Sequence, residues 1–470
     1  MSAGCNIGPE YNPPCTEISE EWKAEQPAAS SIPCVDEWWE VFGDPRLNAL
    51  EEQAIDNNPN LFIALQRVVE ARGQAGVSAA DLYPQFTINP AFDSTGTLFK
   101  LYLPSGVFAL VPGLARVFRV HELIYFLPLN MNYELDLWGK LRGKYRSAFL
   151  NAEAQEEAMR ATWLTLTADV ASNYFNLRAI DAQIQLLKET VDSRRRGFEL
   201  NLSRFKGGIV AYIDVTNAEL QLANTESEYL DNIRQRTALE NALAVLIGVP
   251  ATDFCLEANP LEGAPPVVPA GIPCSILVQR PDIAQAELSM VSQHALIGVA
   301  YASFLPSFNL TGTVGFQSPD FHDFLKWNSR YWQVGYNSSQ VFFDAGLRAA
   351  NVEIAWARYE EARGNYRQTV LAAFSEVENA LNDIEWQTKQ AKALDVAVRA
   401  AIQTNQLSNN RYNSGIVSYL EVVQNEQQEL GTRQNYINLL GLRYQATINL
   451  IKALGGRWGN YDKDCCDSSM

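Results

Sequence analysis

The chain has 470 residues, 47% of them hydrophobic, which is enough to bury a large core. Its 37 basic residues are outnumbered by 54 acidic ones, and the net charge of -17 argues against nucleic acid or an anionic membrane surface as a partner. A cationic cargo fits this balance better. No uninterrupted run of about 18 apolar residues occurs, so the sequence predicts that any membrane crossing is made by strands.

Residues 1–44 are predicted to form an N-terminal segment outside the repeated part of the chain. Cys5 follows Ser-Ala-Gly, and a small residue before cysteine is what a lipoprotein signal peptidase requires, although no apolar signal segment precedes it here. A chance Gly-Cys pair is the alternative. Six further cysteines would allow three disulfides in an oxidising compartment, with the pairing left open. They are Cys15, Cys34, Cys255, Cys274, Cys465 and Cys466.

A helix and two strands are predicted to come next. The helix ends near residue 83, because Pro84 is tolerated at a helix-to-strand junction but not inside a helix. Apolar and polar residues then alternate, as they do in membrane strands and also in a half-buried sheet of a soluble protein. The apolar positions are Phe86, Ile88, Pro90 and Phe92 in the first strand, and Leu127, Leu129, Met131, Tyr133 and Leu135 in the return strand.

After Gly139 the period becomes helical for roughly 65 residues, or about 95 Å of helix. Apolar residues at spacings of three and four predict a coiled-coil seam. Gly207 and Gly208 break this helix, and a second helix runs back to about Gly248. A cytoskeletal or scaffold coiled coil would leave the alternating strands unexplained. The seam residues are Leu177, Ile180, Ile184, Leu187 and Val191 in this copy, and Val370, Phe374, Val377, Leu381 and Ile384 in the second copy.

The second half of the sequence repeats the plan of the first half. Residues 204–215 align without gaps with residues 411–422, and six of the twelve positions are identical. The first copy is longer by about 15 residues, which are predicted to lie between Phe99 and His121 and to lengthen either a loop or the strands. The sequence therefore predicts a first repeat at 45–250, a linker at 251–274, a second repeat at 275–456 and a tail at 457–470.

Four strands per chain cannot close a barrel, because about eight are needed even for a packed interior. Three copies would supply twelve strands, and their helices could form a matching tube with an aqueous bore. The sequence therefore predicts a mixed α and β chain, assembled as a trimer, in which a 12-stranded β-barrel is continuous with a long α-helical barrel.

These patterns resemble the outer-membrane efflux factor family (TolC/OprM-like), and in particular its lipoprotein branch. The opening Gly4-Cys5, followed by Gly-Pro and a tyrosine, is similar to that branch after signal removal. The most specific element is Arg280-Pro281-Asp282, although on its own it is also a good helix start. The same family order is followed by Trp38, Trp39, Phe42, Asp44, Pro45, Leu47, Leu50, Ala54, Asn58, Leu61, Ala64 and Arg67.

The resemblance implies a barrel in the outer membrane and a helical tunnel in the periplasm, which docks a periplasmic adaptor protein and an inner-membrane pump. The chain would be a passive exit duct of a tripartite efflux pump for small molecules such as drugs, toxic compounds or metal ions. Cys5 would be its anchor in outer-membrane lipid. An exit duct for type I protein secretion and, more distantly, a soluble structural coiled-coil protein are the alternatives.

No enzymatic function, cofactor or resident metal is predicted. The sequence contains no phosphate-binding Walker loop and no nucleophile motif of the Gly-x-Ser-x-Gly kind. The three histidines, His121, His294 and His322, show no spacing typical of metal ligands.

The resemblance also implies a gate at the periplasmic end, made by carboxylates and a tyrosine near the ends of the helical hairpins. The matching positions are Asp214, Tyr412 and Glu421, while Gln424 stands where family members often have aspartate and Val417 where some have arginine. Because an acid occurs in both copies, a trimer would bring six carboxylates toward one axis and favour cations. A solvated hairpin end is the alternative interpretation.

Overall fold

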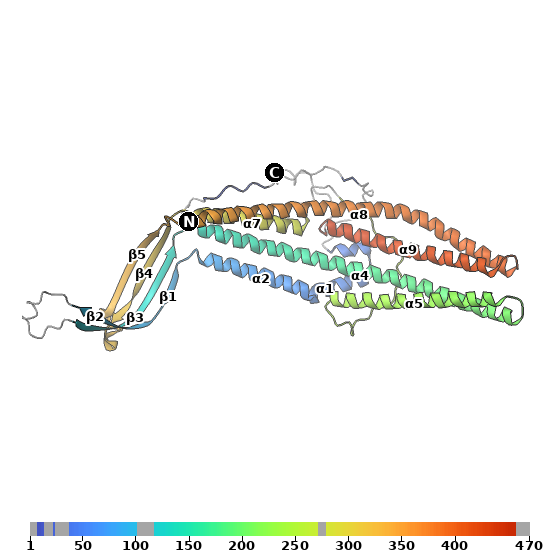
Figure 1. The fold of residues 1–470 in the computed structure, drawn as a ribbon, viewed down its shortest axis with the longest axis horizontal. Coiled ribbons are helices and arrows are strands. Elements are labelled where there is room, and N and C mark those ends of the chain that lie inside the picture. Colours follow the sequence, from blue (N-terminus) through green and yellow to red (C-terminus); the bar gives the residue numbers. More distant parts are fainter. Residues whose placement is uncertain (1–6, 14–21, 24–36, 101–116, 271–278, 457–470) are drawn as a thin grey trace, which may run out of the picture. The chain divides into compact units, whose positions relative to one another are not determined.

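The computed structural model describes residues 7–13, 22–23, 37–100, 117–270 and 279–456 (Figure 1). The chain forms two compact units, and each of them draws on both halves of the sequence. The first unit contains Met1–Asn12, Glu70–Ala152 and Met290–Ala362, and the second contains Pro13–Val69, Glu153–Ser289 and Arg363–Met470. This spatial division cuts across the two sequence repeats, whose boundaries stay a prediction.

Helices make up most of the chain. The long helices α4 and α8 begin directly after Gly139 and Gly346, as predicted, and both glycines have positive φ angles, +78° and +92°. Within the described residues, none of the helices combines the length and the apolar character that a membrane span requires. The described helices are η1 (Trp38–Phe42), α1 (Pro45–Asn57), α2 (Pro59–Ala80), α4 (Lys140–Lys206), α5 (Tyr212–Leu246), α7 (Pro281–Ala302), η2 (Phe321–Asp323), η3 (Trp327–Ser329), α8 (Leu347–Asn413) and α9 (Tyr419–Ala453).

The sheet lies in the first unit and is antiparallel throughout. Its strands are β1 (Gln85–Ile88), β2 (Ala91–Lys100), β3 (Val117–Glu134), β4 (Ser307–Ser318) and β5 (Arg330–Ser339). β3 pairs with β1 and β2 on one side and with β4 on the other, and β4 pairs with β5. The sequence predicted four strands, and the structure has five strand segments. The difference arises because Pro90 cannot donate a ladder hydrogen bond and so divides the first predicted strand. β1 and β2 keep the same register on β3, so they are two segments of one strand.

The two faces of the sheet differ in polarity. On one face Leu129, Val314 and Trp332 lie in register across β3, β4 and β5. On the other face Asn130 lies beside Thr313, whose hydroxyl donates a hydrogen bond of 2.9 Å to the Asn130 side chain. Trp332 is 76% exposed within the single chain, so the apolar face lacks a cover. A large exposed apolar face of this kind marks a surface that contacts lipid or another protein.

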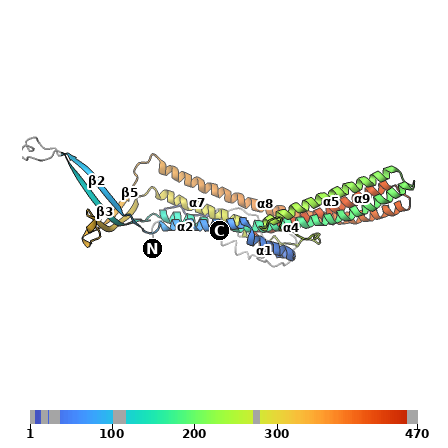
Figure 2. The same ribbon diagram turned by 90° about the horizontal axis from the view of Figure 1, so that it is seen from below.

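The extra residues of the first copy extend the strands. β2 and β3 remain paired as far as Lys100 and Val117, whereas the pairing of β3 with β4 ends at Tyr125 and Ser318. Figure 2 shows β2 and β3 continuing as a narrow ribbon beyond the other strands. The predicted position between Phe99 and His121 also includes residues 101–116, which lie outside the described part of the chain.

The helical hairpins of the second unit are formed by α4 with α5 and by α8 with α9. All ten predicted seam residues are buried or half-buried. A cluster of aromatic rings adds to this core: Trp38 is 1% exposed and its indole N–H donates to Thr167 Oγ1 at 3.1 Å. Phe42 lies 4.8 Å from Phe175, centroid to centroid. Next to this cluster Asp44 caps α1, with Oδ1 3.0 Å from the Arg46 amide, and accepts the Tyr174 hydroxyl at 2.6 Å.

The duplication is also visible in the contacts of the second unit. In the first copy the Asn58 amide donates to the carbonyl of Leu246 at 2.7 Å, and in the second copy Arg280 donates to the carbonyl of Ala453 at 3.0 Å. Leu246 and Ala453 are the last residues of α5 and α9. The final carbonyls of a helix lack partners within the helix. Each returning helix is therefore tied at its end to the residue that precedes α2 or α7.

Two glycines that follow these helix ends allow the chain to pass close to the backbone that precedes α2 and α7. Gly248 and Gly455 have φ angles of +74° and +81°. A Cβ added at Gly248 would lie 2.4 Å from the carbonyl oxygen of Asn57, and one at Gly455 would lie 2.6 Å from that of Gln279. Both positions therefore require glycine for conformation and for space.

Candidate functional site: the ends of the helical hairpins

The predicted gate residues lie at two turns that have the same backbone. Figure 1 shows both turns at the same end of the second unit. We call residues 204–214 tip 1 and residues 411–421 tip 2. Gly208 and Gly415 have φ angles of +70° and +73°, and the amides of Ile209 and Ile416 each donate to the carbonyl five residues earlier at 2.9 Å. This is a Schellman helix end, which favours glycine.

Each tip carries a pair of aromatic rings at equivalent positions. The centroids of Phe205 and Tyr212 are 5.3 Å apart in tip 1, and those of Tyr412 and Tyr419 are 5.5 Å apart in tip 2. Their surroundings differ, because Tyr212 is 61% exposed and Tyr419 only 9%. Tyr419 packs with Ala218 of the first hairpin and with Val422 and Val423. Burial, with a smaller contribution from Glu426, raises the pKa of Tyr419 to about 12, so this ring stays neutral at physiological pH.

Tyr412 joins the two hairpins. Its hydroxyl donates to Asn201 Oδ1 at 2.9 Å, and the Asn201 amide donates to the carbonyl of Gly197 at 3.0 Å. Asn201 is completely buried. The guanidinium of Arg204 lies 4.9 Å from the centroid of the Tyr412 ring, within the range of a cation–π contact. Of the predicted gate residues, Tyr412 therefore belongs to a contact between hairpins.

The predicted acidic residues are placed differently. Glu421 accepts from Arg411 at 3.2 Å, and both side chains are 40% or more exposed, so this ion pair contributes little to stability. The pair joins the two helices of one hairpin. Asp214 is half-exposed in tip 1 and has no ion pair among the described residues, and Gln424 is exposed. Asp214 and Glu421 thus lie in different hairpins and differ in their ion pairing.

A polar cavity of about 170 Å³ lies between the hairpins, along the helices that lead to and from the tips. Its central residue is Arg194, which is 7% exposed and donates to the carbonyl of Gln221 at 3.0 Å and to the hydroxyl of Thr225. Glu426 also lines it, and burial raises the pKa of this carboxyl, opposed by the nearby Arg194. Arg433 bridges Glu189 at 3.8 Å in the first hairpin. This cavity is thus a second polar link between the hairpins.

Sequence reasoning missed Asn201, Arg194 and Arg204. Asn201 is one of many asparagines on a long polar helix surface, and its partner Tyr412 is 211 residues away. Tyr419 could have been found, because it aligns with Tyr212 in the duplicated segment.

The Arg280-Pro281-Asp282 element lies away from the tips and has a structural role. Pro281 is the first residue of α7. The Arg280 guanidinium contacts Asp282 at 2.7 Å and Glu376 at 2.7 Å in addition to the Ala453 carbonyl. The side chain is only 9% exposed, so these partners compensate for its burial. The element therefore fastens the beginning of α7 to α8 and to the end of α9.

The predicted lipid anchor Cys5 lies outside the described residues, as do the cysteines of the predicted disulfides other than Cys255. Cys255 is exposed. Gly8 lies close to α7 in the first unit, because a Cβ added there would be 3.2 Å from the Cα of Gly298. The described part of the chain contains no cluster of three or more residues able to ligate a metal ion.

An amphipathic sheet with an uncovered apolar face, combined with one long helical hairpin from each of two repeats, is the architecture of an outer-membrane channel. The chain belongs to the outer membrane efflux protein family, whose model matches residues 50–249 and 272–456. It is 29% identical to the cation efflux system protein CusC of Escherichia coli O6:H1 over 97% of this chain and 96% of that protein. It is 28% identical to the probable outer membrane lipoprotein SilC of Salmonella typhimurium, over 97% and 96%.

A solved structure agrees with this assignment. The outer-membrane channel OprN superposes with a TM-score of 0.88 at 26% identity, covering 96% of this chain and 99% of that one. The predicted family, the mixed α and β fold, the outer-membrane location and the role as an exit duct for efflux are thereby confirmed.

Proposed function

We propose that three copies of this chain close one passive channel, which exports small molecules together with a periplasmic adaptor and an inner-membrane pump. The observation that carries the proposal is the sheet. Its outer strands, β1 with β2 on one side and β5 on the other, pair with no further described strand. Exposed strand edges invite pairing, and closure into a barrel removes them.

The repeat predicts which residues meet at the closing seam. Leu127 of β3 pairs with Phe316 of β4 within the chain. In the repeated alignment Leu127 corresponds to Val334 and Phe316 to Ser94. Val334 of one copy would therefore lie beside Ser94 of the next copy.

Disulfide cross-linking tests this seam. The Val334→Cys, Ser94→Cys double variant should give a covalent trimer on oxidation in mild detergent. The matched control joins Val334→Cys with Thr97→Cys, which lies on the opposite face of β2 and should cross-link poorly. Monomers and dimers as the only products of the first variant would refute the trimer.

For the cargo we propose small molecules, with cations favoured. Relatives are named for cation efflux (CusC) and for solvent efflux (SrpC), and both kinds of cargo are small. The net charge of -17 favours cations inside a narrow pore. We also propose that Asp214, Tyr412 and Glu421 of the hairpin tips form the periplasmic gate together with Gln424, which follows tip 2 on α9, and that Cys5 carries the lipid anchor.

Single-channel conductance tests the gate. We expect small, cation-selective openings for the unmodified protein and larger or less selective ones for the Asp214→Ala, Glu421→Ala variant. Unchanged conductance and selectivity would place the gate elsewhere. Drug and metal susceptibility of cells that carry the matching pump and adaptor, with and without this chain, tests the cargo class.

A further inference from the structure

The ribbon formed by β2 and β3 beyond the sheet has two chemically different faces. We define the ribbon as residues 93–100 and 117–124, which within one chain pair only with each other among the described residues, although the proposed closing seam would place Ser94 beside the next copy. Figure 2 shows it running on past β4 and β5. Because side chains alternate along a strand, the register assigns each residue to the apolar or the polar face of the adjoining sheet.

Positive charge lies on the face that continues the apolar side of the sheet. Lys100 pairs with Val117 and Leu98 with Arg119, both on this outward face. The two acidic residues of the ribbon, Asp93 and Glu122, are on the opposite, inward face. All of these side chains are exposed. The ribbon therefore separates its charges by face, in a chain whose overall charge is strongly negative.

Aromatic rings mark the level at which the ribbon leaves the sheet. The ring of Tyr125 lies 5.0 Å from Phe92, 5.4 Å from Phe321 and 6.0 Å from Phe324, between centroids. Clusters of this kind occupy the boundary between hydrocarbon and headgroups in strand-built membrane proteins. Arg119 is six residues beyond Tyr125, at most about 20 Å along the strand. The outward cations are thus at the height of lipid headgroups or of the sugars above them.

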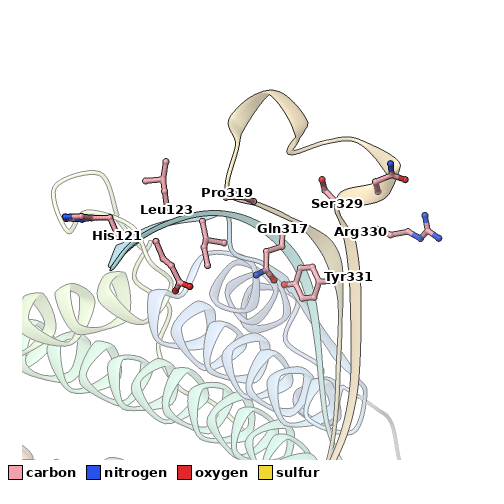
Figure 3. A pocket seen from close by; sticks show the side chains of 10 residues that line it. His121, Leu123, Gln317, Pro319, Ser329, Arg330 and Tyr331 are labelled. Atoms are coloured by element: carbon pink, nitrogen blue, oxygen red, sulfur yellow. The ribbon is translucent and has the colours of Figure 1, made fainter. Parts of the chain in front are cut away.

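A cavity of about 510 Å³ at the same level is lined by one further cation, Arg330, and by the carboxylate of Glu122. It lies between β3 and the segment that links β4 to β5, and Gln317, Tyr331 and Arg330 line it. In Figure 3 the Arg330 side chain points away from Gln317 and Tyr331. Its guanidinium stands over the ring of Trp327 at 4.4 Å. Arg330 pairs with Phe316 and so belongs to the same outward face.

We propose that the outward face of the ribbon binds the phosphate groups of lipopolysaccharide in the outer leaflet, with Arg119 and Lys100 as the contacting cations. Leu123 continues the apolar surface beneath them, and Leu98 and Val117 lie beside them. Cationic side chains recognise phosphate by charge-assisted hydrogen bonds, and the inward position of Asp93 and Glu122 keeps carboxylates away from this anionic surface. The ribbon would thus hold the channel mouth among the glycolipid headgroups.

The test compares two variants of the full-length protein that each remove two charges from the ribbon. Arg119→Gln with Lys100→Gln changes the outward face, and Asp93→Asn with Glu122→Gln changes the inward face as a matched control. Each protein is titrated in detergent with bisphosphorylated lipid A, and bound lipid is counted by native mass spectrometry. Each cation near an anionic lipid surface contributes about fivefold in affinity, so the outward variant should bind about 25-fold more weakly.

The control variant should bind as the unmodified protein does. Lipid A lacking its phosphates should bind all three proteins equally weakly, and millimolar inorganic phosphate should not displace the intact lipid. Equal binding of bisphosphorylated lipid A by the outward variant and the unmodified protein would refute the proposal, as would full displacement by free phosphate. Circular dichroism and trimer retention of both variants show that a loss of binding is not a loss of fold.

Discussion

Glu51 provides a test of the energetics of the second unit. It lies on α1 with its side chain completely buried, and neither carboxyl oxygen has a hydrogen-bond partner among the described residues. Burial raises its pKa from the ordinary 4.5 to about 9. Without a compensating charge, the carboxyl group is therefore protonated in the folded chain at neutral pH.

The sign of the pH dependence follows from proton binding. Between pH 4.5 and pH 9 the folded chain holds a proton on Glu51 that the unfolded chain has released. The contribution of Glu51 to stability is complete below pH 4.5 and is lost as the pH rises toward 9. Each pH unit within this window costs about 1.4 kcal/mol per chain. At pH 8 the accumulated loss is up to about 5 kcal/mol.

Denaturant unfolding of the purified protein at pH 6, 7 and 8 measures this slope. Glu51→Gln keeps the shape of the side chain but cannot ionise, so it should remove the slope and be more stable than the unmodified chain at pH 8. Glu52→Gln is the matched control, because Glu52 is the next residue and is exposed. It should leave the slope unchanged. Parallel pH profiles for Glu51→Gln and the unmodified chain would show that Glu51 ionises freely and would refute the argument.

Three further predictions concern contacts within the second unit. Gly248→Ala should lower the melting temperature more than Gly263→Ala. Both positions have positive φ, but only at Gly248 would the added Cβ lie 2.4 Å from a carbonyl oxygen. Equal shifts in melting temperature would show that this close contact does not destabilise the fold. Arg280→Gln should cost about 2 kcal/mol, because it removes two charged hydrogen bonds to half-exposed or exposed carboxylates and one bond to the buried carbonyl of Ala453. Asn58→Ala should cost about 1 kcal/mol. Denaturant unfolding measures both losses, and the reverse order would contradict the assigned contacts. Tyr412→Phe removes the hydrogen bond to Asn201, so it should increase the frequency of channel opening in planar bilayers and lower stability by about 1 kcal/mol. An unchanged opening frequency would show that this hydrogen bond does not keep the channel closed.

The order of helices and strands was predictable because glycine and proline mark the ends of these elements, and because the same pattern occurs in both repeats. Gly139 and Gly346 both precede a long helix, and α2 and α7 both end shortly before a proline. The burial of Glu51 could also have been predicted from the sequence. Glu51 lies four residues after Leu47 and three before Ala54, and this spacing places all three on one face of the helix.

The contacts between hairpins were not predictable in the same way. They depend on how each long helix is rotated about its axis, and a rotation by one residue would turn Asn201 away from Tyr412. The similar repeat segments do not reveal that Tyr419 is buried in tip 2 whereas the equivalent Tyr212 is exposed in tip 1. Sequence similarity between the copies fixes their backbone, whereas the neighbours of each copy decide which side chains are covered.

This difference between the tips bears on how the proposed gate would open. Arg204 and Arg411 are equivalent in sequence, yet Arg204 contacts the ring of Tyr412 across the hairpins and Arg411 pairs with Glu421 inside one hairpin. A movement of the second hairpin away from the first would break the contacts of Tyr412 with Arg204 and Asn201. It would leave the Arg411–Glu421 pair intact, because both residues move together. In the proposed gate, the contacts of Tyr412 and the Arg433–Glu189 ion pair would therefore have to break before the hairpins separate, whereas the Arg411–Glu421 pair would not.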